Sequence, residues 1–93
     1  MGSIEDSVEI TGLSRDQVVL LGDSRHLADI AAVMMGDYLM HMHRGADAVC
    51  EMICKDMRLA LGAGRVDEAR VLYATLQDFL AEYPRAARGA APA

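Results

Sequence analysis

The sequence predicts an all-α fold: a small bundle of three to four helices, completed by dimerisation. Apolar residues recur at helical spacing over most of the chain, and glycines or a proline separate these stretches. The one segment that alternates like a strand, residues 8–11, has no second strand to pair with. We therefore expect helices over residues 14–21, 25–43, 46–61 and 65–83, within a single domain over residues 13–83.

The two ends of the chain carry no helical pattern. Residues 1–12 include Glu5, Asp6 and Glu9, so we expect a flexible acidic arm that lies on the bundle or on a partner. Residues 84–93 read PRAARGAAPA, which is small and featureless, and we expect a disordered tail there.

The first helix has the clearest local signal in the chain. Ser14 at the N-cap and Gln17 three residues later form a capping box, and Leu13 with Val18 occupies the positions of a hydrophobic staple. Gly22 is a typical residue to end this helix.

The second helix contains the stretch around which we expect the rest to be arranged, residues 27–42. One face carries Leu27, Ala31, Met34, Tyr38 and Met42, and further apolar residues (Ile30, Val33, Met35, Leu39, Met40) cover most of the remainder. A helix that is apolar nearly all round belongs inside the fold. Gly36 within it suits the close approach of another backbone.

The end of this helix has two interpretations. His43 and Arg44 followed by Gly45 resemble a helix C-terminus, yet the apolar register continues into residues 46–61, so one bent helix over 25–61 is the alternative. Residues 46–61 and 65–83 are joined by the short segment 62–64, and Pro84 ends the last helix, which predicts an antiparallel hairpin. We expect its first helix to turn inward Ala46, Val49, Ile53, Met57 and Ala60.

Composition narrows the function classes. The formal charge is −5 and the nine Lys and Arg residues are scattered singly, which disfavours a nucleic-acid partner. No apolar run is long enough to span a membrane, and the acidic first residues do not resemble a signal peptide. With only two cysteines, the chain fits a reducing compartment, and we expect it in the cytoplasm.

Cys50 and Cys54 lie on one face of a helix, but residues at this spacing have Cβ atoms about 5–6 Å apart, too far for a disulfide. In a continuous helix His43 would join the same line, giving a possible metal set of His43, Cys50 and Cys54. The simpler interpretation is that both cysteines are small core residues. We therefore expect no metal and no cofactor, and keep a metal- or thiol-responsive sensor as an alternative.

Catalytic patterns are missing from the sequence, so we expect a protein that is not an enzyme. Seven methionines in so short a chain favour a binding surface that adapts to its partner. Asp29 and Asp37 interrupt the apolar helix, where they could pair with arginines of a second chain. The residues expected to form the interaction surface are Leu27, Ile30, Met34, Met35, Tyr38, Leu39 and Met42.

These observations predict a small cytoplasmic homodimer that binds another protein as an adaptor, antiactivator or inhibitor. The Met-rich surface would accept an apolar helix of that partner. A helical chaperone for one dedicated partner is a second alternative.

Overall fold

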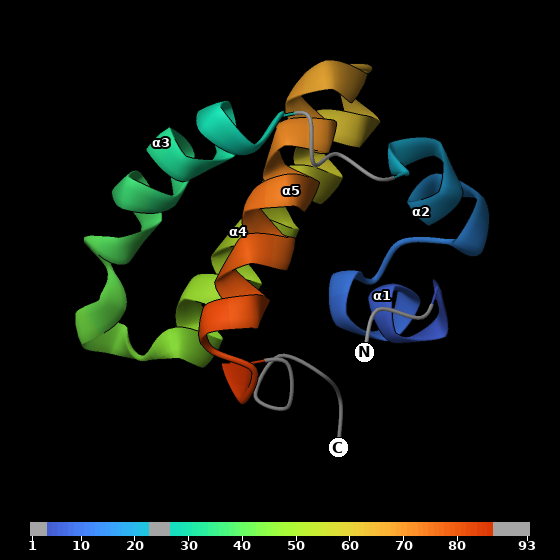
Figure 1. Cartoon of the computed structure of the whole chain (residues 1–93). Helices are drawn as coiled ribbons and strands as arrows, with labels where there is room; N and C mark the ends of the chain where they lie inside the picture. Colours follow the sequence, from blue (N-terminus) through green and yellow to red (C-terminus); the bar gives the residue numbers. More distant parts are fainter. Residues whose placement is uncertain (1–3, 23–26, 87–93) are drawn as a thin grey trace.

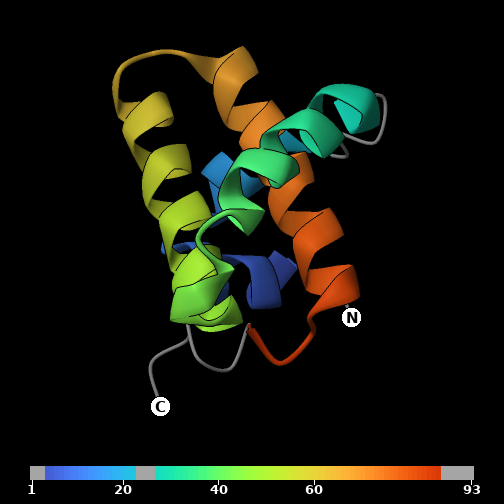
Figure 2. The same ribbon diagram turned by 90° about the vertical axis from the view of Figure 1, so that its left-hand side faces the viewer.

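Helices α4 (Ala46–Gly62) and α5 (Val66–Glu82) form an antiparallel hairpin at the centre of the structure (Figures 1 and 2). Their facing sides supply the largest fully buried side chains, which include Ile53 and Met57 from α4 and Leu72, Leu76 and Phe79 from α5. The predicted hairpin is thus confirmed. Of the inward residues expected on α4, four are buried, and Ala46 at its first position is half-buried.

The computed structural model describes residues 4–22 and 27–86, and every element among them is helical. Besides the hairpin these are α1 (Ile4–Thr11), α2 (Arg15–Leu21), α3 (Ala28–Leu39) and the short 3-10 helix η2 (Met42–Arg44). The all-α class is therefore confirmed, although five α-helices replace the three or four expected. Within the described ranges, no helix is both long and apolar enough to cross a membrane.

The expectation of a non-helical arm over residues 1–12 is wrong for residues 4–11, which form α1. Helix α1 packs against α4 and α2. Arg58 of α4 donates a hydrogen bond of 2.6 Å from Nη1 to the carbonyl oxygen of Thr11, and Thr11 itself is fully buried. So short a helix is marginal in isolation and owes its stability to such packing, which a local pattern does not reveal.

Helix α2 begins as predicted. Ser14 is its N-cap: the Ser14 hydroxyl accepts a hydrogen bond from the backbone N–H of Gln17, and the Gln17 side chain accepts one from the backbone N–H of Ser14. Leu13 and Val18 are both buried, and the helix ends before Gly22. Residues 23–26, where the second helix was expected to begin, lie outside the described residues.

The chain breaks between α3 and α4 rather than forming one bent helix. After α3 it passes through η2 and reaches Gly45, whose φ of 101° is a conformation that favours glycine. A Cβ at this position would also come within 2.9 Å of Oδ1 of Asp47. The single-helix alternative for residues 25–61 is therefore wrong.

Helix α3 does not lie at the centre of the molecule. It packs mainly against α5 on one side of the hairpin, whereas α1 and α2 lie on the opposite side (Figure 1). Figure 2 shows α3 in front of the hairpin with α1 and α2 behind it. The hairpin helices bury one another, so α3 covers them from outside and buries only one of its own faces.

The last described residues follow α5. Tyr83 packs on Phe79 with ring centroids 4.9 Å apart, and Ala86 is buried against the core. One residue of the predicted disordered tail, Ala86, thus packs on the core, whereas residues 84 and 85 are exposed. Residues 87–93 lie outside the described residues.

Candidate functional site

The outward side of α3 exposes large apolar side chains. Val33 is 72% exposed, Met40 at the end of the helix is 78% exposed and Ile30 is 52% exposed. We call this surface the outer face of α3 and define it by Ile30, Ala32, Val33, Gly36, Leu39 and Met40. The helical spacing places two exposed carboxylates, Asp29 and Asp37, among these apolar residues. Single exposed apolar residues are ordinary on protein surfaces, whereas several on one helix make that surface a candidate site of interaction.

This face differs from the interaction surface that the sequence predicts. Tyr38 is buried, Leu27 is half-buried, and three other expected contacts are half-buried against the core: Met34, Met35 and Met42. Only Ile30 and Leu39 of the expected set are exposed. The sequence reasoning missed Val33 and Met40 as surface residues, because a helix that is apolar all round carries no signal for which face turns inward.

Small residues lie beside the large ones on the outer face of α3. A Cβ added to Gly36 would meet no atom within 4 Å, and Ala32 one turn earlier is exposed. The same face therefore carries both protruding side chains, Val33 and Met40, and a hollow in which another backbone can approach. Asp29 and Asp37, which were expected to pair with a second chain, are both exposed on this helix.

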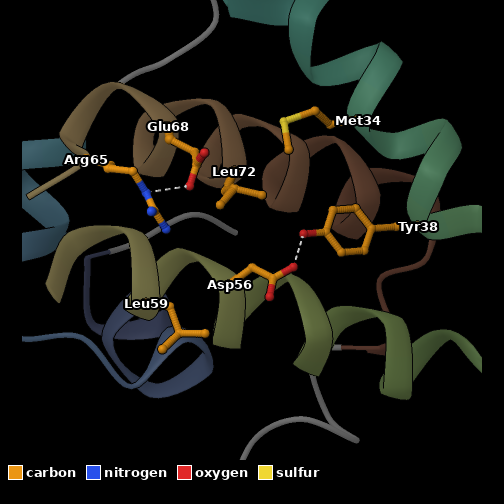
Figure 3. Close-up of a pocket in the computed structure, with 7 residues that line it drawn as sticks. All are labelled: Met34, Tyr38, Asp56, Leu59, Arg65, Glu68 and Leu72. Carbon is orange, nitrogen blue, oxygen red and sulfur yellow. Dashed lines mark hydrogen bonds and ion pairs between the residues drawn. The ribbon is translucent and has the colours of Figure 1, made fainter. Parts of the chain in front are cut away.

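A second feature is a small cavity between α3 and α4, with α5 along the side opposite α4 (Figure 3). Its volume is about 280 Å³. It is lined by Met34 and Tyr38 of α3, Asp56 and Leu59 of α4, Glu68 and Leu72 of α5, and Arg65 just before α5. Figure 3 shows Tyr38 and Arg65 towards opposite ends, with the carboxylates of Asp56 and Glu68 between them on opposite sides.

Two polar interactions organise this cavity. The Tyr38 hydroxyl donates a hydrogen bond of 2.5 Å to Oδ2 of Asp56, and Nε of Arg65 donates one of 3.1 Å to Oε2 of Glu68. Burial raises the pKa of Tyr38 above its usual range, and the hydrogen bond to Asp56 and the negative charges of Asp56, Glu68 and Asp37 raise it further. The cavity is therefore an environment that disfavours an additional negative charge.

The two cysteines are buried thiols on the side of α4 that α1 covers. Sγ of Cys54 donates a hydrogen bond of 3.5 Å to the carbonyl oxygen of Ile10. Its hydrogen bond with Cys50 and its burial raise the pKa of the Cys54 thiol. His43 lies on η2 and is exposed. The break at Gly45 interrupts the helical line that would have aligned His43 with the cysteines.

Metal-ligating side chains do not gather elsewhere in the part of the chain that the structure describes. In residues 4–22 and 27–86, no three His, Cys, Asp or Glu residues are placed to hold a metal ion together. Comparison with known proteins found no match among protein-family models, curated proteins or solved structures. The outer face of α3 and the cavity beside it are therefore the two features that bear on function.

Proposed function

We propose that this protein is a small cytoplasmic protein-binding regulator that works as a homodimer joined through the outer face of α3. The observation that carries the proposal is the exposure of Val33, Met40 and Ile30 on one helix. Contact with a second apolar surface would remove these side chains from water, which stabilises an assembly by about 25 cal/mol for each Å² of apolar area. The proposed role requires neither catalysis nor a cofactor.

A second copy of the chain suits this face because the face carries both large and small apolar residues. In a two-fold dimer the same patch meets itself, so protruding and hollow positions must lie on one surface. Val33 and Met40 supply the protruding side chains, and Ala32 with Gly36 supplies the hollow. The small core supports the same conclusion, since domains of this size often rely on association for part of their stability.

Light scattering over a concentration series, with the double variant Val33→Asp/Met40→Asp, tests the proposal. We expect the wild-type protein to reach twice the mass of one chain and the double variant to stay monomeric, because two carboxylates would be buried at the seam. Val19→Asp is the matched control, since Val19 is 58% exposed on α2 and lies away from α3. Far-ultraviolet circular dichroism establishes that each variant is folded.

Two results would contradict the proposal. One is a wild-type protein that remains a monomer at every concentration. The other is a folded double variant that associates as strongly as the wild type. If Val19→Asp also abolished association, the seam would lie elsewhere or involve more than α3.

A further inference from the structure

We propose that the cavity between α3 and α4 binds a Lys or Arg side chain from an apolar segment of a partner protein. This inference deepens the proposed function by naming the chemistry of the partner, and it rests on the protein being a protein-binding regulator. It does not depend on the dimer seam, because it concerns the inner side of α3 whereas the seam is on the outer face.

The shape of the site suits a protein side chain. Helix α3 packs mainly on α5 and touches α4 much less, so the space between α3 and α4 is only partly filled. At about 280 Å³ the cavity is just below the range of ligand pockets, which measure roughly 300–1,000 Å³, and it is too small for a typical cofactor. One long side chain fits such a volume.

Apolar residues supply the walls along which the stem of that side chain would lie. Met34 is half-buried, Leu72 is buried and Leu59 is 58% exposed. A Lys or Arg side chain buries its methylene stem on such surfaces while its charged end reaches polar groups. Because Leu59 is exposed, apolar residues that flank the basic residue in a partner segment could pack on it.

The charges of the site select a cation. Asp56 and Glu68 carry negative charge on opposite sides of the cavity, and Arg65 offsets one of these charges (Figure 3). A carboxylate accepts up to about four hydrogen bonds, so the bond from Tyr38 leaves Asp56 with capacity for more. A basic group entering between the two carboxylates would therefore gain hydrogen bonds that are strengthened by charge.

The pair between Arg65 and Glu68 does not block this binding. Their side chains are 59% and 48% exposed. Ion pairs exposed to this degree contribute little, so a second cation can share Glu68 or displace Arg65 at small cost. The proposed arrangement thus uses Asp56 as the principal acceptor and Glu68 as the second.

A protein segment is favoured over a free amine. A small amine would gain the contacts to the carboxylates alone, which salt weakens at a partly open site. A segment with apolar residues on either side of the basic one would also cover Leu59, adding the burial that a free amine lacks.

Peptide binding measured by fluorescence anisotropy tests the inference. The probes are two short labelled helical peptides with leucines on one face, identical except that one carries arginine where the other carries glutamate. We expect the arginine peptide to bind the wild-type protein about tenfold more tightly or better, a difference of about 1.4 kcal/mol. Asp56→Asn and Glu68→Gln should each reduce this preference, and the double variant should abolish it.

The matched control is Glu51→Gln, which removes an exposed carboxylate of α4 that does not line the cavity. It should leave the preference for arginine intact. Equal binding of the two peptides, or a preference that survives in the Asp56→Asn/Glu68→Gln double variant, would overturn the inference. Binding of free agmatine as tight as that of the arginine peptide would overturn the assignment to a protein partner.

Light scattering on the same variants separates this inference from the dimer. Asp56→Asn/Glu68→Gln should keep the wild-type mass, because neither residue lies on the outer face of α3 and the asparagine side-chain oxygen still accepts the hydrogen bond from Tyr38 that orients this helix. A monomeric wild-type protein that still prefers the arginine peptide would refute the dimer and support the cavity. A dimeric protein that binds the two peptides equally would support the dimer and refute the cavity.

Discussion

The Tyr38 hydroxyl donates a hydrogen bond of 2.5 Å to Oδ2 of Asp56 and so ties α3 to α4. Tyr38 is otherwise buried among apolar residues of the core. The bond favours one rotation of α3 about its own axis. Tyr38 and Val33 lie on different sides of this helix, so when Tyr38 faces the core, Val33 faces away from it. The same hydrogen bond thus lines the cavity and determines which residues of α3 form its outer face.

The first prediction concerns the strength of this bond. Tyr38→Phe should lower the free energy of unfolding by about 1 kcal/mol, because it removes one hydrogen bond while the ring still fills its site. Urea unfolding of both proteins at neutral pH measures the difference. The matched control is Tyr83→Phe, at a tyrosine that is half-buried beside Phe79. An equal loss of unfolding free energy in both variants would show that the hydrogen bond of Tyr38 does not stabilise the fold.

The same tyrosine predicts a dependence on alkaline pH. The pKa of Tyr38 is higher in the folded protein than in the unfolded chain, where it is near 10. Its contribution to stability is therefore fully present below about pH 10 and is lost as the pH rises above that value. The stability difference between wild type and Tyr38→Phe should stay constant at neutral pH and shrink in alkaline solution. A difference that grows above pH 10 would contradict the assigned direction.

Two glycines should respond in opposite ways to the same substitution. Gly36→Ala should raise the unfolding free energy of the monomer by about 1 kcal/mol, because Gly36 lies inside a helix with open space around it. Gly45→Ala should lower the free energy by at least about 1 kcal/mol, because of its positive φ and the close Asp47 carboxylate. Thermal unfolding at low protein concentration measures both effects. In the proposed dimer Gly36→Ala should also weaken association, since it begins to fill the hollow.

Replacing each of two buried threonines by valine should lower the unfolding free energy by different amounts. Thr11 accepts a hydrogen bond of 3.2 Å from the buried backbone N–H of Leu13, so Thr11→Val leaves that donor without its partner and should cost about 1–3 kcal/mol. The Thr75 hydroxyl donates to the carbonyl oxygen of Val71 at 2.8 Å, within its own helix. Thr75→Val should cost less than about 1 kcal/mol. Urea unfolding of the two variants gives the comparison, and equal losses would contradict it.

The buried cysteines should be protected from reagents. Cys50 and Cys54 are both buried, and Cys54 contacts Ile10 of α1. Their mutual hydrogen bond and burial raise the pKa of Cys54, whereas the same hydrogen bond lowers the pKa of Cys50, so the protection of Cys50 depends on burial alone. Because a reagent must reach a buried thiol, both should react with a disulfide reagent at least about a hundredfold more slowly in the native protein than in urea. Reaction of either thiol at the rate of the unfolded chain would show that α1 does not cover them stably.

Much of the fold could be predicted because it depends on local signals. The capping box of Ser14 and Gln17 starts α2, Gly45 separates α3 from α4, and the connection at residues 62–64 pairs α4 with α5. Each of these features depends on backbone conformation or on hydrogen bonds between residues close in the chain. They can therefore be recognised without knowing the rest of the structure.

Helix α1 and the outer face of α3 could not be predicted in this way. Helix α1 depends on contacts with α4, such as the bond from Arg58 to Thr11 across many intervening residues. The sequence also did not show which face of α3 turns inward. Val33 and Tyr38 lie on different sides of this helix, and both are largely apolar. Periodicity alone predicted a helix over residues 25–43, which the structure confirms for Ala28–Leu39. Packing on α5 and the bond to Asp56 left Val33 and Met40 exposed, since an outer helix can bury only the face that touches its neighbours.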